Sequence, residues 1–144
     1  MARVIRDAVH GYVELCPVQE SILGTRAFQR LRYVRQNDVG YLTYPGLTQT
    51  RFEHSLGTSC FARKLFRAVI GNDHDGSARQ RIISETKEAV PGISRWTDGT
   101  VLDHVEKALV LFGMIHDIGH LPFSHLTESA LHGLEEGAYE NWAD

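Results

Sequence analysis

The sequence has few cysteines, no long apolar run and little net charge, and each absence excludes a class of protein. Its two cysteines, Cys16 and Cys60, are too few for a disulfide framework and do not form a C-x-x-C motif. No segment reaches the roughly 18 uninterrupted apolar residues of a membrane-spanning helix, and residues 1–7 lack the apolar stretch of an export signal. We therefore expect a cytoplasmic protein with no membrane partner.

The formal net charge is −3 at pH 7, so the chain as a whole does not attract nucleic acid or an anionic membrane. A local basic patch could still bind nucleic acid, a partner that stays open without being indicated. Hydrophobic residues make up 42% and charged residues 23% of the sequence, the usual balance of a globular protein. With 144 residues the chain has the size of one domain, so we interpret residues 1–144 as a single domain.

The expected fold is all-α, mainly helical, with a small N-terminal β hairpin. Residues 3–15 are rich in β-branched and aromatic residues and are interrupted by His10-Gly11, a pattern typical of a short hairpin. Elsewhere apolar residues recur every three or four positions between turn signals, which predicts helices. The predicted helices span residues 17–23, 26–35, 51–70, 77–89, 98–115 and 124–134.

Two helix starts have recognisable caps. Thr50 and Glu53 form a T-x-x-E capping box, and Asp98 is a candidate cap for the helix that runs to Ile115. The end of that last helix is apolar nearly all round, so we expect it to be deeply buried. Its predicted core-facing stripe consists of Val101, Leu102, Val105, Leu109, Phe112 and Ile115. The apolar set of the helix over 51–70 consists of Leu56, Cys60, Phe61, Leu65, Phe66 and Val69.

Histidines give the first chemical signal, because four of the eight lie between residues 116 and 132. Chance predicts about 0.4 His-Asp dipeptides in this composition, and the sequence has two. His74-Asp75 lies in a polar turn and is interpreted as part of a solvated loop. His116-Asp117 ends an apolar helix, where an ionisable pair is costly unless a metal ion or hydrogen bonds compensate. The alternative is a hydrogen-bonded core His116 beside an Asp117 that caps or orients a neighbour.

The remaining polar residues are given structural interpretations. His10, His104 and His132 are expected to be structural. Four arginines make residues 26–35 basic, and such a charged helix face is usually solvated. They are Arg26, Arg30, Arg32 and Arg35.

Five blocks follow one another along the chain, and together they resemble the deoxynucleoside triphosphate triphosphohydrolase branch of the HD superfamily. The resemblance covers most of residues 4–128. The blocks are Asp7-Ala-Val-His-Gly, Phe28-Gln-Arg-Leu-Arg, Tyr44-Pro-Gly, Arg51-Phe-Glu-His-Ser-Leu-Gly and His116-Asp-Ile-Gly-His-Leu-Pro-Phe-Ser-His.

The resemblance implies a metal-dependent phosphohydrolase that converts deoxynucleoside triphosphates to deoxynucleoside and inorganic triphosphate. It also implies that His54, His116 and Asp117 ligate one divalent ion, which could be Mn, Fe, Mg, Zn or Ni. Members of this branch assemble, so a homo-oligomer is expected.

The same resemblance implies roles for four more residues. Arg51 matches an arginine that contacts phosphate and belongs to the catalytic set, and its planar donors suit that role. His120 matches a catalytic histidine, and His125 matches a second histidine that lines the pocket of the α-phosphate. Gln36 matches a glutamine that binds the substrate near the sugar.

The pattern departs from the family at several positions. Family members have a fourth metal ligand, an aspartate on a later helix, whereas this sequence ends at Asp144 before such a helix. We therefore expect a domain that is incomplete at its C-terminus. Tyr139 stands where many relatives have a catalytic histidine. Gly24 and Arg6 stand at positions that read a guanine activator in nucleotide-activated relatives, so activation by GTP is not expected.

Two other functions stay open. The first keeps the metal but changes the substrate to another phosphoester, such as a nucleoside monophosphate, a cyclic nucleotide or single-stranded nucleic acid. The Arg51-Phe-Glu-His-Ser block favours the triphosphate over these. The second is a catalytically inactive nucleotide-binding or oligomerisation module, which the absent aspartate and Tyr139 would explain.

Overall fold

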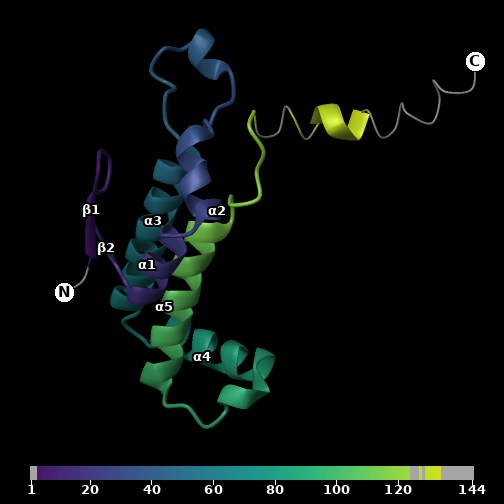
Figure 1. Ribbon diagram of the computed structural model, residues 1–144. Coiled ribbons are helices and arrows are strands. Elements are labelled where there is room, and N and C mark those ends of the chain that lie inside the picture. The colour runs from purple at the N-terminus through teal and green to yellow at the C-terminus, as the bar shows by residue number, and fades with distance from the viewer. Residues whose placement is uncertain (1–2, 124–126, 128, 134–144) are drawn as a thin grey trace, which may run out of the picture.

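The computed structural model describes residues 3–123, 127 and 129–133, and it is mainly helical with an N-terminal hairpin, as predicted (Figure 1). The hairpin consists of β1 (Arg3–Asp7) and β2 (Gly11–Leu15). The α-helices are α1 (Pro17–Leu23), α2 (Arg26–Gln29), α3 (Arg51–Gly71), α4 (Ser77–Ala89) and α5 (Asp98–Ile115). Three short 3-10 helices are η1 (Arg30–Tyr33), η2 (Gly40–Leu42) and η3 (Pro91–Ile93). Of the helix expected over 124–134, residues 127 and 129–133 are described and are helical, and the other positions lie outside the described residues.

The hairpin pairs β1 with β2 in antiparallel register, with Ile5 opposite Val13. Gly11 closes the turn with a φ of 75°, a conformation that glycine adopts without steric cost. The Asp7 carboxylate accepts hydrogen bonds from the backbone N–H groups of Val9 and His10, at 2.9 and 2.7 Å. Val13 and Leu15 of β2 are buried in the main core cluster, which fixes the hairpin to the helices.

The helix predicted over 26–35 is shorter than expected. Thr25 caps α2 by accepting from the Phe28 N–H, but the α-helix ends at Gln29 and continues only as the 3-10 turn η1. The chain then becomes extended, because the Arg51 N–H donates to the Val34 carbonyl at 2.8 Å and Arg35 forms a bridge with Thr50. Pairing with a distant segment therefore overrides the local helical pattern.

The longest helices, α3 and α5, lie side by side and form the main body of the fold (Figure 1). The predicted capping box starts α3, since Glu53 accepts from the Thr50 N–H at 2.7 Å and donates its own N–H to Thr50. The cap predicted for α5 is wrong by one residue. Thr97 caps the helix through its side chain, and Asp98 is the first helical residue.

The buried face of α5 also differs from the predicted stripe. Val101 is buried as expected, but Leu109, Phe112 and Ile115 are 41%, 68% and 40% exposed. The residues that face inward on the second half of the helix are Val110, Gly113 and Met114. Hydropathy alone could not select this face, because the segment is apolar on all sides.

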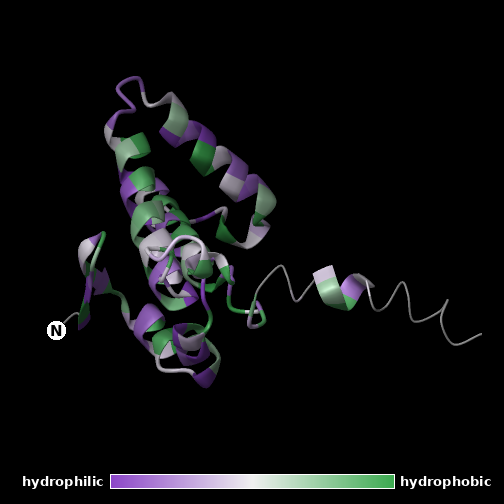
Figure 2. Cartoon of the chain, turned by 90° about the horizontal axis from the view of Figure 1, so that it is seen from above, coloured by the Kyte–Doolittle hydropathy of each residue, from purple (hydrophilic) through white to green (hydrophobic). Residues whose placement is uncertain are grey.

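Part of the apolar set of α3 is likewise exposed, including Phe61, Leu65 and Val69. Figure 2 shows apolar and polar segments interleaved along the helices. Within the described part of the chain, no helix is both long and apolar enough to cross a membrane.

Gly113 determines how closely α3 and α5 approach. A Cβ atom at this position would lie 3.1 Å from the Thr58 carbonyl oxygen and 3.2 Å from the backbone N and Cα of Ser59. These are backbone atoms of α3, which cannot rotate away as a side chain can. A larger residue would therefore push the two helices apart.

We predict that Gly113→Val destabilises the fold by about 1–3 kcal/mol, the usual cost of overpacking a tight contact. The measurement is urea unfolding followed by circular dichroism. Gly99→Val is the matched control, because Gly99 is on the same helix and a Cβ atom added there would meet no described atom within 4 Å. Equal losses of stability in the two variants would contradict the role of Gly113.

Candidate metal centre

The candidate site lies where the first turn of α3 meets the last turn of α5. Arg51 and His54 are three residues apart on α3, so their side chains lie on the same face. His116 is the C-cap of α5, and Asp117 and His120 belong to the turn that follows. The close contact at Gly113, one turn before His116, brings the two groups together.

The carboxylate of Asp117 is the centre of the site, and its side chain is 8% exposed. Its Oδ2 atom lies 2.5 Å from a guanidinium nitrogen of Arg51 and 3.5 Å from Nε2 of His54. Its Oδ1 atom lies 3.3 Å from Nε2 of His116 and 3.4 Å from Nε2 of His120. The Asp117 carboxylate is thus surrounded by one guanidinium, which is positively charged, and by three imidazole rings, which can offer a lone pair.

His116 has a defined ring orientation. Its Nδ1 atom lies 3.0 Å from the Gly113 carbonyl oxygen, which can only accept a hydrogen bond. Nδ1 therefore carries the hydrogen, and in the neutral ring Nε2 keeps its lone pair on the side of Asp117. This arrangement, in which one ring nitrogen is fixed by a carbonyl, is usual for a metal-binding histidine.

His54 is held in the form that a metal requires. Burial lowers the pKa of its imidazole below the usual value, and the nearby His116 and Arg51 lower it further, while Asp117 acts in the opposite direction. The neutral ring, which has a lone pair to donate, is therefore favoured.

The donor atoms of His54, His116 and Asp117 all lie within 4.8 Å of one another. Two imidazole nitrogens and one carboxylate oxygen are ligands that suit several first-row divalent ions. The residues present therefore fit a metal ion, although in the described structure the Asp117 carboxylate also pairs with Arg51. The same three residues were predicted from the sequence.

The structure describes three of the four other predicted site residues. His120 joins the cluster through Asp117, and Arg51 is 2% exposed and paired with the same carboxylate. Gln36 lies beside the start of α3, since its N–H donates to the Gln49 carbonyl at 3.0 Å. Its Oε1 atom is buried and accepts no hydrogen bond from the described residues. His125 lies outside the described residues.

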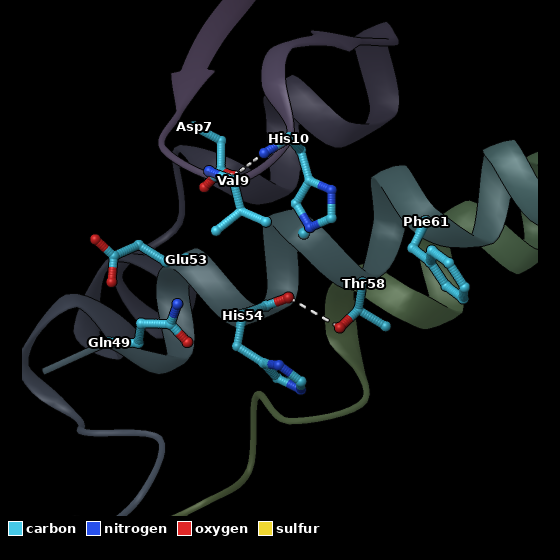
Figure 3. Close-up of a pocket in the computed structure, with 9 residues that line it drawn as sticks. Asp7, Val9, His10, Gln49, Glu53, His54, Thr58 and Phe61 are labelled. Atoms are coloured by element: carbon cyan, nitrogen blue, oxygen red, sulfur yellow. Dashed lines mark hydrogen bonds between the residues drawn. The ribbon is translucent and has the colours of Figure 1, made fainter. Parts of the chain in front are cut away.

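A cavity of about 290 Å³ adjoins His54 on the side of the hairpin (Figure 3). It is lined by residues of the β1–β2 turn and of the first turns of α3. Sequence reasoning missed it, although Gly57 in the middle of a helix was a signal: a Cβ there would lie 2.7 Å from Nε2 of His10. The lining residues are Asp7, Val9, His10, Gln49, Glu53, His54, Gly57, Thr58 and Phe61.

Comparison with known proteins gives a consistent result. The chain is 34% identical over 124 residues to the deoxynucleoside triphosphate triphosphohydrolase SAMHD1 of Bos taurus, a match that covers 86% of this chain and 17% of that protein. It is 33% identical over 124 residues to the Homo sapiens protein of the same name, covering 86% and 16%. It is 31% identical over 123 residues to the putative HD domain-containing protein L394 of Acanthamoeba polyphaga mimivirus, covering 85% and 24%. No protein-family model matches the chain.

These similarities show that the chain belongs to the HD-domain superfamily. Within that superfamily it is similar to the deoxynucleoside triphosphate triphosphohydrolases. The chain spans about a sixth of the length of these SAMHD1 relatives, since 17% and 16% of the two proteins are matched.

We predict that His116→Ala weakens the binding of a divalent metal at least about tenfold. Mutation of a residue that merely hydrogen-bonds a metal ligand typically lowers metal affinity by about that factor, and His116 would be a ligand itself. The measurement is metal content after dialysis against Mn²⁺, by mass spectrometry. His74→Ala is the matched control, since it changes the other His-Asp dipeptide at an exposed position. Unchanged metal content in His116→Ala would contradict the assignment.

Proposed function

We propose that this chain carries the metal-binding part of a phosphohydrolase that converts deoxynucleoside triphosphates to deoxynucleoside and inorganic triphosphate. The observation that carries the proposal is the convergence of four side chains on the buried carboxylate of Asp117. These side chains are His54, His116, Arg51 and His120. The similarity to SAMHD1 proteins, which are deoxynucleoside triphosphate triphosphohydrolases, supports the substrate class.

His54, His116 and Asp117 would hold one divalent ion, which could be Mn, Fe, Mg, Zn or Ni. When bound, such an ion lowers the pKa of a coordinated water and offsets the charge of the phosphates. The chain prepares for this in two ways. The Gly113 carbonyl orients the His116 ring, and burial lowers the pKa of His54, which favours its neutral form.

Arg51 and His120 would act on the phosphates beside the ion. The guanidinium of Arg51 pairs with the Asp117 carboxylate and brings a fixed positive charge to the site. The His120 ring lies 3.4 Å from Asp117 and could hold or donate a proton to a phosphate oxygen. His125 at the α-phosphate and Gln36 near the sugar belong to the same proposal.

The cavity beside His54 provides room for a ligand next to the metal ligands. Homo-oligomer formation and a cytoplasmic location stay predictions from the sequence.

We predict that the chain with Mn²⁺ releases inorganic triphosphate from deoxynucleoside triphosphates, and that Arg51→Lys lowers kcat/KM about 100-fold. Lysine keeps the charge but loses the planar set of donors, and one electrostatic donor is typically worth a factor of this order. The measurement is product analysis by anion-exchange chromatography.

The control variant is Arg81→Lys, whose side chain is 79% exposed on α4. It should keep wild-type activity. Release of pyrophosphate or orthophosphate in place of triphosphate, or activity that survives removal of the metal with EDTA, would contradict the proposed reaction.

A further inference from the structure

The sequence suggested that Arg30 lies on a solvated basic helix face, but the structure places it elsewhere. Its side chain is partly buried and reaches a segment about ninety positions away along the chain. One terminal nitrogen donates to the His120 carbonyl at 2.7 Å, and the other donates to the Ile118 carbonyl at 2.6 Å. The guanidinium therefore binds the turn that follows the His-Asp pair through two hydrogen bonds.

The turn follows the C-terminus of α5, which ends at Ile115. Carbonyl groups at and beyond a helix end have no intrahelical donor. Within the turn, the Ile118 N–H donates to the Ile115 carbonyl at 3.0 Å and the His120 N–H to the Asp117 carbonyl at 3.2 Å. These bonds use other carbonyls, so Arg30 satisfies those of Ile118 and His120 from outside.

The base of Arg30 is fixed in the core. Its neighbours Phe28 and Leu31 are both completely buried, and the Phe28 ring packs edge-on against Phe52 with centroids 5.3 Å apart. Phe52 directly follows Arg51 on α3. Arg30 therefore links the turn to the helix that carries Arg51 and His54.

The other arginines of the segment have different contacts. Arg32 stacks over the Phe52 ring at 3.6 Å and binds Gln29. Arg35 donates to the Thr48 carbonyl at 2.7 Å. Of the hydrogen bonds among described residues, those of Arg30 are the ones that join this segment to the turn.

We propose that Arg30 is a positioning residue that sets where Asp117 and His120 stand relative to the ligands on α3. Two parallel donors fix the turn in both position and rotation, which the point charge of a lysine cannot do. The contribution of Arg30 to catalysis rests on the proposed function, whereas its effect on the turn does not.

The first test measures Mn²⁺ affinity of the full chain by electron paramagnetic resonance. Arg30→Gln should bind Mn²⁺ about 10–100-fold more weakly, and Arg30→Lys about tenfold more weakly, as is usual when the support of a metal ligand is removed. Arg26→Gln, an exposed change on α2, should bind as the wild type does. Wild-type affinity in Arg30→Gln, or full recovery in Arg30→Lys, would overturn the proposal.

The second test distinguishes positioning from general stability, using amide hydrogen exchange in the metal-free chain. In Arg30→Gln the His120 amide should exchange at least about tenfold faster, while amides in α4 keep their wild-type rates. An equal acceleration in all helices would show a general loss of stability and would overturn the positioning role.

The third test concerns turnover. If the chain releases triphosphate, Arg30→Gln should lower kcat about tenfold or more and change KM less than about twofold, since the groups affected act on the reaction rather than on substrate capture. A change in KM alone would overturn the role in catalysis. A wild-type chain without turnover would refute the proposed function, while the exchange test would still decide the role of Arg30.

Discussion

The buried negative charge of Asp117 is the constraint on which this structure depends. A carboxylate removed from water must be compensated by opposite charge or hydrogen bonds, and leaving it unpaired would cost several kcal/mol. Here Arg51, at the start of α3, supplies the positive charge. Nitrogen atoms of His54, His116 and His120 lie around the same carboxylate, at 3.5, 3.3 and 3.4 Å. The carboxylate and these imidazoles suit a divalent ion, and the guanidinium suits a phosphate.

This arrangement requires the two helix ends to be close. Gly113 allows the backbones of α5 and α3 to approach near Ser59, one turn before His116 and Asp117. The N-terminus of α3 is fixed by its capping box and by the hydrogen bond from the Arg51 N–H to the Val34 carbonyl. The backbone positions of Arg51 and His54 are therefore defined. Helix packing and the cap of α3 therefore hold the site in place. Arg30 adds hydrogen bonds to the turn after α5, at the Ile118 and His120 carbonyls.

The HD-domain relatives and the site support the same chemistry from independent directions. The similarity covers 86% of this chain. Because the chain corresponds to about a sixth of the SAMHD1 proteins, the activity of the whole protein is a proposal. Metal binding by His54, His116 and Asp117, by contrast, can be tested on this chain directly.

The sequence by itself determined the features that depend on local or motif-based information. The capping box at Thr50 and Glu53, the hairpin turn at Gly11 and the grouping of His54, His116 and Asp117 could all be predicted, because a few neighbouring residues or a family motif define them. Metal binding by this group stays a prediction. Only the tertiary structure decided which face of α5 is buried, since an all-round apolar segment has no preferred side until Gly113 meets α3. The same holds for Arg30, whose partners are distant in sequence and whose role no local pattern could indicate.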